Sequence, residues 1–325
     1  MDYSTPLHRL GTTDLMLSPI GLGTWQFSKQ KNIAGRVWPT LEDELINRIV
    51  RISIEGGINW FDTAEVYGNG ASEKALAGSL ARTGKKPGEV YVATKWWPMF
   101  RTASNIPKSI SQRLENLSPF PVDLYQVHHP FGFSSEKSEM AAMARLVKER
   151  KVRHVGVSNF SASKMRSAWE ALHKEGIPLV SNQVRYNLLD RRIETNGILQ
   201  TAKELGITII AYSPLAQGLV TGKFHENPQL LKKAGLRKYS SLFNTSGLEK
   251  TRPLVGTVRD LADKYGVTPS QIALNWLINF HNGTVVAIPG ATKESHAKDN
   301  TGAMHFRMTP DDLLLLDRMS AVFKK

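Results

Sequence analysis

Cysteine is absent from all 325 residues of the sequence. Its absence excludes disulfides, thiolate metal sites and a cysteine nucleophile, although it does not by itself identify a cellular compartment. No apolar run approaches the roughly 20 residues that a transmembrane helix needs. The first residues also lack the basic segment and apolar stretch of a signal peptide. The sequence therefore predicts a cytoplasmic protein without membrane insertion.

Acidic residues are in deficit, with 29 Asp and Glu against 42 Lys and Arg and a formal net charge of +13. Such an excess favours anionic partners. The basic residues are scattered, however, with only modest clusters at 148–154 and 231–238 and no nucleic-acid-binding signature. We therefore expect a solvated basic surface and an anionic small molecule as ligand, and no nucleic acid.

Short apolar segments alternate with amphipathic helical patterns along almost the whole chain. Most of these segments are rich in β-branched residues and apolar on both faces, as parallel strands covered by helices are. The segments are 18–23, 57–62, 90–95, 122–128, 152–158, 178–184, 207–213 and 284–290. This alternation predicts a single-domain α/β protein over 1–325, a (β/α)8 TIM barrel. An open doubly wound sheet is the alternative, but no GxGxxG follows the first strand.

Helix boundaries are marked by recognisable caps. Thr40 is expected to begin a helix with Asp43 as its capping-box partner, and Gly56–Gly57 to end it. Thr268 and Thr309, each followed by proline, are expected to begin two more. Other helical patterns cover 72–82, 104–117, 137–150, 161–175, 193–205 and 254–265.

Two segments lie outside the alternating pattern. Residues 7–20 have the pattern of a β-hairpin around Gly11-Thr12-Thr13, which we expect to close the bottom of the barrel. Residues 214–253, after the seventh strand, form a connection that is too long for a neutral loop. The sequence predicts that this long loop is a lid or clamp.

Polar residues stand at the end of nearly every predicted strand. They are Asp62, Lys95, His128, Ser158-Asn159, Gln183, Tyr212-Ser213 and Gly290. Because the carboxyl ends of the strands meet at one rim of a barrel, these residues are expected to form a site there.

Asp62 and Lys95 end neighbouring strands and are expected to pair, with Tyr67 folding back over the same rim. A lysine cation at about 4 Å would stabilise the tyrosinate by roughly 4 kcal/mol, or about three pKa units. The pattern therefore predicts that the pKa of Tyr67 falls from about 10 towards 7, which suits a general acid. His128 is expected to orient a carbonyl or assist the proton transfer.

Each of these residues also has a simpler interpretation. Asp62 alone could cap a helix, Tyr67 could pack with a polar tip and Lys95 could lie on the surface. His128 and His129 invite a metal interpretation, but adjacent strand residues point to opposite faces and no carboxylate cluster accompanies them. We expect no metal site.

A second group of residues resembles a binding surface. Ser158, Asn159 and Gln183 offer groups for a planar carboxamide, and Tyr212 a ring for stacking. One segment offers exposed backbone N–H groups and a cation, which suit a pyrophosphate; its residues are Gly218, Thr221, Gly222 and Lys223. A second segment lies near a predicted helix N-terminus, which suits a phosphate; its residues are Thr292, Lys293 and His296. Aromatic residues past strand ends are expected to line a substrate pocket or to pack at the rim; they are Trp25, Trp96, Trp97 and Phe100.

Eight motifs in order resemble the aldo-keto reductase superfamily, over almost the whole chain. They are GLGTW (21–25), FDTAEVYG (61–68), ATK (93–95), VDLYQVHHP (122–130), VGVSNF (155–160), NQVRYN (182–187), AYSPLAQGLVTGK (211–223) and IPGATK (288–293). The AYSPLAQGLVTGK motif and the long segment after it look closer to the bacterial, plant and potassium-channel β-subunit branch than to the mammalian aldose reductases.

The resemblance implies an NADP(H)-dependent enzyme that reduces aldehydes and ketones on a (β/α)8 barrel. It assigns Asp62, Tyr67, Lys95 and His128 as catalytic residues, with Tyr67 as the proton donor. The substrate pocket implied is formed by Trp25, Tyr67, Trp96, Trp97, His128 and His129. The cofactor-binding residues implied are Thr24, Trp25, Asp62, Ser158, Asn159, Gln183, Tyr212, Ser213, Pro214, Leu215, Gln217, Gly218, Leu219, Lys223, Ile288, Gly290, Thr292, Lys293, His296, Asp299 and Asn300.

Three positions depart from the family pattern. His129 stands where many members have tryptophan, which implies a more polar substrate wall. Gly290 replaces a basic residue of the aldose-reductase type and His296 a frequent glutamine, which weakens NADP relative to NAD. Thr292, Lys293 and the basic charge still favour NADP(H), with NAD(H) the less favoured cofactor.

Two other functions fit the sequence. One is an NADPH-binding, redox-sensing regulatory subunit with low turnover, and the other a phosphosugar-processing barrel without nicotinamide. The expected partner of the reductase is a small carbonyl substrate, and an oligomer is compatible with the sequence.

Overall fold

The computed structural model describes residues 6–28, 40–233 and 241–325. Eight parallel strands lie side by side in chain order. They are β3 (Leu22–Gly23), β4 (Trp60–Asp62), β5 (Tyr91–Trp96), β6 (Val122–Val127), β7 (Val152–Ser158), β8 (Leu179–Arg185), β9 (Thr208–Tyr212) and β10 (Val285–Ala287). Parallel bridges from Ile20 to Ala287 and from Gly23 to Gly290 join the first strand to the last. The sheet is thus closed into the predicted (β/α)8 barrel.

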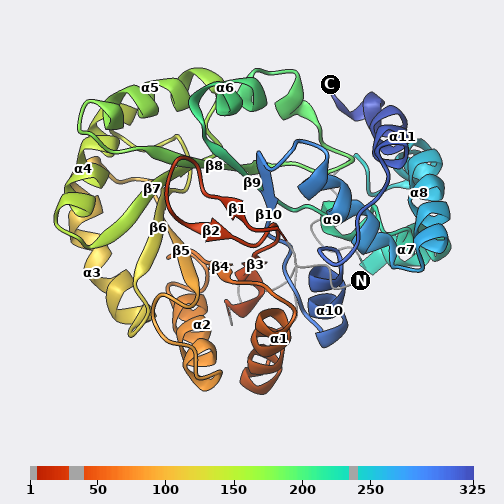
Figure 1. Cartoon of the computed structure of the whole chain (residues 1–325), viewed down its shortest axis with the longest axis horizontal. Coiled ribbons are helices and arrows are strands. Elements are labelled where there is room, and N and C mark those ends of the chain that lie inside the picture. The colour runs from red at the N-terminus through yellow and green to blue at the C-terminus, as the bar shows by residue number, and fades with distance from the viewer. Residues whose placement is uncertain (1–5, 29–39, 234–240) are drawn as a thin grey trace.

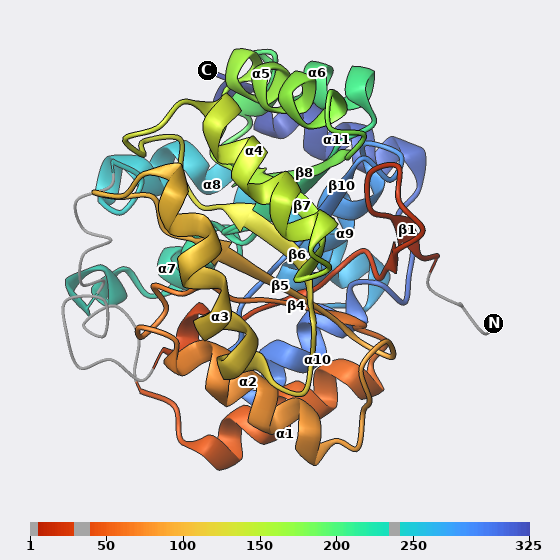
Figure 2. The same ribbon diagram turned by 90° about the vertical axis from the view of Figure 1, so that its left-hand side faces the viewer.

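Helices surround this barrel on the outside (Figures 1 and 2). They are α1 (Asp43–Glu55), α2 (Ala71–Arg82), α3 (Ile106–Leu117), α4 (Glu136–Lys148), α5 (Ala162–His173), α6 (Ile198–Leu205), α7 (Lys223–Glu226), α8 (Thr245–Tyr265), α9 (Pro269–Asn279), α10 (Glu294–Gly302) and α11 (Pro310–Ser320). The predicted helix starts at Thr268 and Thr309 are present: Thr268 forms a capping box with Gln271, and Thr309 accepts the N–H of Asp312.

The inside of the barrel changes from apolar to polar along the strands. Trp60, Ala93 and Leu124 belong to an inner apolar cluster separate from the core between sheet and helices. Two residues further along the same strands, and so on the same face, stand Asp62, Lys95 and Gln126. The apolar layer therefore forms a floor directly below a buried polar layer.

The N-terminal hairpin closes the bottom of this floor, as predicted. Its strands are β1 (His8–Arg9) and β2 (Met16–Leu17), and it contributes Leu10, Leu15 and Leu17 to the inner cluster. Gly11 has φ of +55°, and a Cβ there would lie 2.8 Å from the carbonyl oxygen of Val180. Glycine thus lets the hairpin turn pack against the strand ends.

The first helix begins at Asp43 with Glu42 as its N-cap, so the predicted start after Thr40 is wrong. The connection after β9 is long, as predicted, but it contains short helices at 216–218, 223–226 and 228–233, and α8 already begins at Thr245. Its role as a lid or clamp stays a prediction. The side chain of Asn244 accepts the N–H of Gly247 and so starts α8 early, with Pro253 inside the helix. Part of the predicted basic cluster 231–238 lies outside the described residues.

Candidate active site

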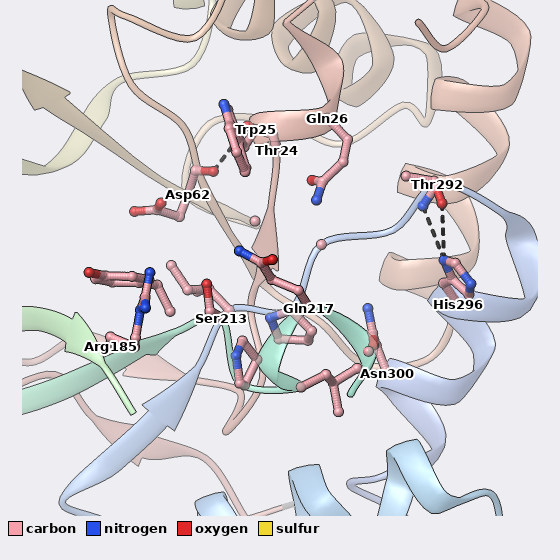
Figure 3. Close-up of a pocket in the computed structure, with 18 of the residues that line it drawn as sticks. Thr24, Trp25, Gln26, Asp62, Arg185, Ser213, Gln217, Thr292, His296 and Asn300 are labelled. Carbon is pink, nitrogen blue, oxygen red and sulfur yellow. Dashed lines mark hydrogen bonds between the residues drawn. The ribbon is translucent and has the colours of Figure 1, made fainter. Parts of the chain in front are cut away.

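A cavity of about 610 Å³ lies at the carboxyl ends of the strands. Figure 3 shows its two sides, with Asp62 and Arg185 facing Thr292, His296 and Asn300 across the opening. Most of the residues predicted to bind a cofactor or substrate line it. These are Thr24, Trp25, Asp62, Tyr67, His128, His129, Ser158, Asn159, Gln183, Tyr212, Ser213, Pro214, Leu215, Gln217, Gly218, Lys223, Ile288, Gly290, Thr292, His296, Asp299 and Asn300.

Asp62 and Lys95 form a fully buried ion pair at the base of the cavity, as predicted. Lys95 Nζ also donates to the carbonyl oxygen of Thr63 at 2.8 Å. The other oxygen of Asp62 accepts from Gln183 at 2.8 Å and from Gln126 at 3.2 Å. Desolvation lowers the pKa of Lys95, but Asp62 and Tyr67 outweigh it, and the pKa is raised overall. Lys95 is therefore a cation at neutral pH.

Tyr67 lies above this pair, half-buried, with its hydroxyl 3.5 Å from Lys95 Nζ. Desolvation raises the pKa of Tyr67 above its usual 10, while the Lys95 cation acts in the opposite direction. The prediction of a pKa lowered towards 7 is therefore wrong, because removing the phenolate from water costs more than Lys95 returns. Tyr67 holds its proton at neutral pH.

His128 is 8% exposed and its ring meets the Tyr67 ring edge-on at 5.9 Å. Desolvation and Lys95 lower the pKa of His128 well below 6.5, so the ring is neutral at pH 7. His129 stacks on His128 at 5.1 Å and on Phe131 at 4.7 Å. These rings form an aromatic wall beside Tyr67.

Polar side chains from the ends of β7 and β9 form a second hydrogen-bond network. The hydroxyl of Tyr212 donates to Asn159 Oδ1 at 2.9 Å, and Asn159 Nδ2 donates to Ser158 Oγ at 2.9 Å. Asn159 has φ of +61°, an uncommon conformation that asparagine tolerates better than most residues. The network fixes the amide of Asn159 at the cavity wall.

The segment after β9 presents its backbone to the cavity. Gly218 has φ of +87°, and a Cβ there would lie 2.6 Å from Lys223 Nζ. Gly222 also has φ of +87° and is the N-cap of α7, whose first residue is Lys223. Close backbone approach next to a cation suits a phosphate group.

The far side of the cavity contains buried polar atoms without protein partners among the described residues. They are Gln26 Oε1 and Asn300 Nδ2. His296 Nδ1 faces the N–H of Thr292 at 3.3 Å and its hydroxyl at 3.2 Å (Figure 3). Such unpaired atoms are costly unless a polar ligand binds them. The residues present therefore fit a large polar cofactor.

Several predicted residues do not line the cavity. Trp96 is fully buried in the outer core, with Nε1 donating to Asn105, because its side chain points away from the barrel axis. Its assignment to the substrate pocket is therefore wrong. Leu219 is also fully buried, and Lys293 is the N-cap of α10, outside the lining.

Trp97 does not line the cavity but packs against residues that do. It is packed edge-on against His128, His129 and Phe131 at 5.2, 5.4 and 5.6 Å. Phe100 is 80% exposed and contacts Phe133, outside the cavity. These two aromatic residues support or flank the wall instead of facing the cavity.

Sequence reasoning missed Gln26, Arg185, Ser270 and Ser295, all of which line the cavity. Arg185 could have been found, because it stands two residues after Gln183 on the same strand and so shares its face. Ser270 is at a helix start whose position in space no local pattern gives.

A buried ion network lies behind Tyr67. Arg113 donates to Glu65 and to Glu73, each at 2.8 Å. Glu65 also accepts from Arg101 at 2.7 Å and from the N–H of Trp97. Because Glu65 belongs to the short segment between Asp62 and Tyr67, the network ties the Tyr67 segment to the aromatic wall.

A sequence model described as "Aldo/keto reductase family" matches residues 19–321. The chain belongs to this family. The curated relatives include a chloroplastic pyridoxal reductase of Arabidopsis thaliana, 32% identical over 96% of this chain and 86% of that protein. They also include the aldo-keto reductase str7 of Strobilurus tenacellus, 27% identical over 97% of this chain and 92% of the relative.

Solved structures that resemble this chain include further aldo-keto reductases. A glycerol dehydrogenase from Gluconobacter oxydans has a TM-score of 0.84 and 28% identity, covering 98% of this chain and 96% of its own. An aldo/keto reductase from Klebsiella pneumoniae in complex with NADP and acetate has a TM-score of 0.73 and 25% identity, with the same coverages. The family member described here is therefore an oxidoreductase with a nicotinamide cofactor.

The described residues contain neither a membrane-spanning helix nor a cluster of metal ligands. None of their helices is long and apolar enough to cross a lipid bilayer. No group of three or more His, Cys, Asp or Glu side chains in this part of the chain is placed to hold a metal ion. The cytoplasmic location stays a prediction, since one relative is chloroplastic.

Proposed function

We propose that this reductase converts aldehydes and ketones to alcohols with NADPH, and that Tyr67 is the proton donor. The observation that carries the proposal is the buried Asp62–Lys95 pair directly beneath the Tyr67 hydroxyl, at one end of a large cavity. A protonated tyrosine held next to a fixed cation can donate a proton to a carbonyl oxygen that gains negative charge.

Each residue around Tyr67 has a separate role in the proton transfer. Asp62 keeps Lys95 charged and in place, and Lys95 favours the phenolate that Tyr67 becomes on giving up its proton. His128 is neutral and buried beside Tyr67, where it can orient the carbonyl by a hydrogen bond. When bound, the nicotinamide supplies the hydride that reaches the carbonyl carbon.

The cofactor would be held along the cavity. Ser158, Asn159 and Gln183 offer amide and hydroxyl groups for a carboxamide, and Tyr212 offers a ring for stacking. Gly218 and Lys223 would hold the pyrophosphate. The orphaned amides Gln26 and Asn300 support a polar group at the far side.

NADP(H) is the preferred cofactor in this proposal, over NAD(H). Thr292 and His296 lie together at the far side, and the net charge is +13. Position 290 is a glycine and so provides no basic side chain for the phosphate. The Gln26 side chain fills the space that a Cβ at this position would take. A binding titration with NADPH and NADH at several salt concentrations checks the preference, since a phosphate contact weakens with salt.

The test of the proton donor is Tyr67→Phe with methylglyoxal and an aromatic aldehyde as substrates. We expect NADPH consumption to fall about 10²- to 10⁴-fold, the range for loss of a general acid, while the NADPH affinity is kept. The matched control is Tyr91→Phe, which removes a hydroxyl at the start of β5, away from the cavity. Equal activity of Tyr67→Phe and wild type would refute the assignment.

The same assay separates the other functions. NADPH binding without turnover in the wild type would support the redox-sensing subunit with low turnover, whereas failure to bind NADPH would support the phosphosugar barrel. The single domain over 1–325 and the absence of nucleic-acid partners stay predictions. The oligomeric state also stays open, and size-exclusion chromatography with light scattering measures it.

A further inference from the structure

Arg185 is a cavity residue to which the proposed reaction gives no role. It is the last residue of β8, paired in register with Tyr212 of β9, and its side chain is exposed. Its guanidinium lies 5.9 Å from the centre of the Tyr212 ring. Figure 3 shows it rising from β8 beside Ser213, on the same side of the cavity as Asp62.

The strand geometry places Arg185 directly above the catalytic layer. Gln183, two residues earlier on the same face, donates to Asp62 at 2.8 Å. Two residues of strand advance about 6–7 Å. A group bound by Arg185 therefore lies several bonds away from a carbonyl bound at Tyr67.

The charges around Arg185 leave it available to a ligand. Lys95 is neutralised by Asp62, and desolvation lowers the pKa of His129 as it does that of His128. The neighbouring Arg192 is bound at two points by Asp190, at 2.8 and 2.7 Å. Within the described ranges, Arg185 belongs to no ion pair with a carboxylate, and it interacts with the Tyr212 side chain. The catalytic end of the cavity thus has an uncompensated positive charge.

We propose that Arg185 is a specificity residue that binds a carboxylate on the carbonyl substrate, remote from the reacting carbon. The substrate class is then carboxylated aldehydes and ketones, such as semialdehydes and formylbenzoates. A planar guanidinium matches a carboxylate with two parallel N–H···O bonds. This inference rests on the proposed reductase function.

The experiment compares matched substrates on Arg185→Met. The pairs are 4-carboxybenzaldehyde with benzaldehyde, and succinic semialdehyde with butanal. We expect kcat/KM for the carboxylated member to fall at least about tenfold, the loss of one charged hydrogen-bonded contact, and that for the neutral member to change less than about twofold. Arg192→Met is the control, since it removes a nearby charge that is already neutralised.

A binding measurement makes the test independent of turnover. Calorimetry with the NADPH-loaded protein, in which an alcohol cannot react, compares 4-(hydroxymethyl)benzoate with benzyl alcohol, and the preference for the carboxylate is expected to disappear in Arg185→Met. Equal losses for both members of a pair, or an unchanged preference, would overturn the proposal. A matching loss of NADPH affinity would also overturn it and assign Arg185 to the cofactor. If the wild type binds these ligands but reduces no carbonyl, the reductase function fails while the carboxylate site stands.

Discussion

The two sides of the cavity differ in that one contains a buried ion pair whose charged groups all have protein partners, and the other, in the part of the chain that the structure describes, does not. On one side, both oxygens of Asp62 have donors and Lys95 has three partners, all from the chain itself, although Gln126 Oε1 and His128 Nδ1 beside them are buried without partners among the described residues. On the other, Gln26 Oε1 and Asn300 Nδ2 are buried without partners among the described residues. A group that must hold its orientation through a reaction benefits from fixed partners. A group that binds a ligand must leave its bonding capacity open.

The comparison also holds for charge. The Asp62–Lys95 pair and the Glu65–Arg113–Glu73 network are buried, with opposite charges in contact. Lys223, the cation on the other side, is exposed. Substitutions on the side of the Asp62–Lys95 pair should therefore reduce catalysis and stability. Substitutions on the side of Lys223 should reduce cofactor affinity. Four predictions test this division.

Replacing Lys95 with Met should have the largest effect. We expect kcat to fall about 10²- to 10⁴-fold, because Tyr67 loses the cation that favours its phenolate. Unfolding by urea should show a loss of about 3–5 kcal/mol, since Asp62 is left buried and unpaired. The control is Asp62→Asn/Lys95→Met, which should regain much of the stability and none of the activity. Unchanged stability of the single variant would contradict this reading of the pair.

Glu65→Gln should reduce both stability and activity. We expect a loss of about 3 kcal/mol in the free energy of unfolding, because Arg101 and Arg113 lose a buried charged partner. A drop of about tenfold in kcat/KM should accompany it, from displacement of Tyr67 and Trp97. Glu73→Gln is the matched control, since it removes another charge from Arg113 without touching Trp97. Equal loss of kcat/KM in both variants would show that the network acts only on stability.

Lys223→Met should change affinity alone. We expect the Kd for NADPH to rise about tenfold, as for the loss of one charged contact, with kcat at saturation within about twofold of wild type. Fluorescence titration at two salt concentrations measures the Kd, and the variant should be less sensitive to salt. Lys298→Met, which removes a charge from the exposed face of α10 outside the cavity, should leave the Kd unchanged.

The smallest expected effect is that of pH on reduction. Carbonyl reduction needs the protonated form of Tyr67, and desolvation raises its pKa above 10. The proton is therefore present from pH 6 to 9 and is lost only above pH 10. We expect the kcat/KM for a neutral aldehyde to be flat between pH 6 and 9. A decline centred near pH 7 would show instead that Lys95 outweighs desolvation.

The sequence by itself determined the fold and most of the cavity lining. Short apolar strands alternating with helices specify a parallel barrel, and the residue that ends each strand necessarily reaches its carboxyl rim. Asp62, Lys95, His128 and Gln183 were found in this way without knowledge of any distance. The hairpin of residues 7–20 was found from its turn residues and alternation.

Only the tertiary structure decided features that depend on burial or on contacts distant in the sequence. The pKa of Tyr67 depends on the balance between desolvation and the Lys95 charge, and its sign follows from how deeply the chain encloses the phenol. Trp96 and Trp97 are adjacent, yet one is buried in the outer core and the other packs on His128, because successive strand residues face opposite sides. The contacts of Glu65 with Arg101 and Arg113 join segments 36 and 48 residues apart. No local pattern contains those distances, because packing of the whole barrel sets them.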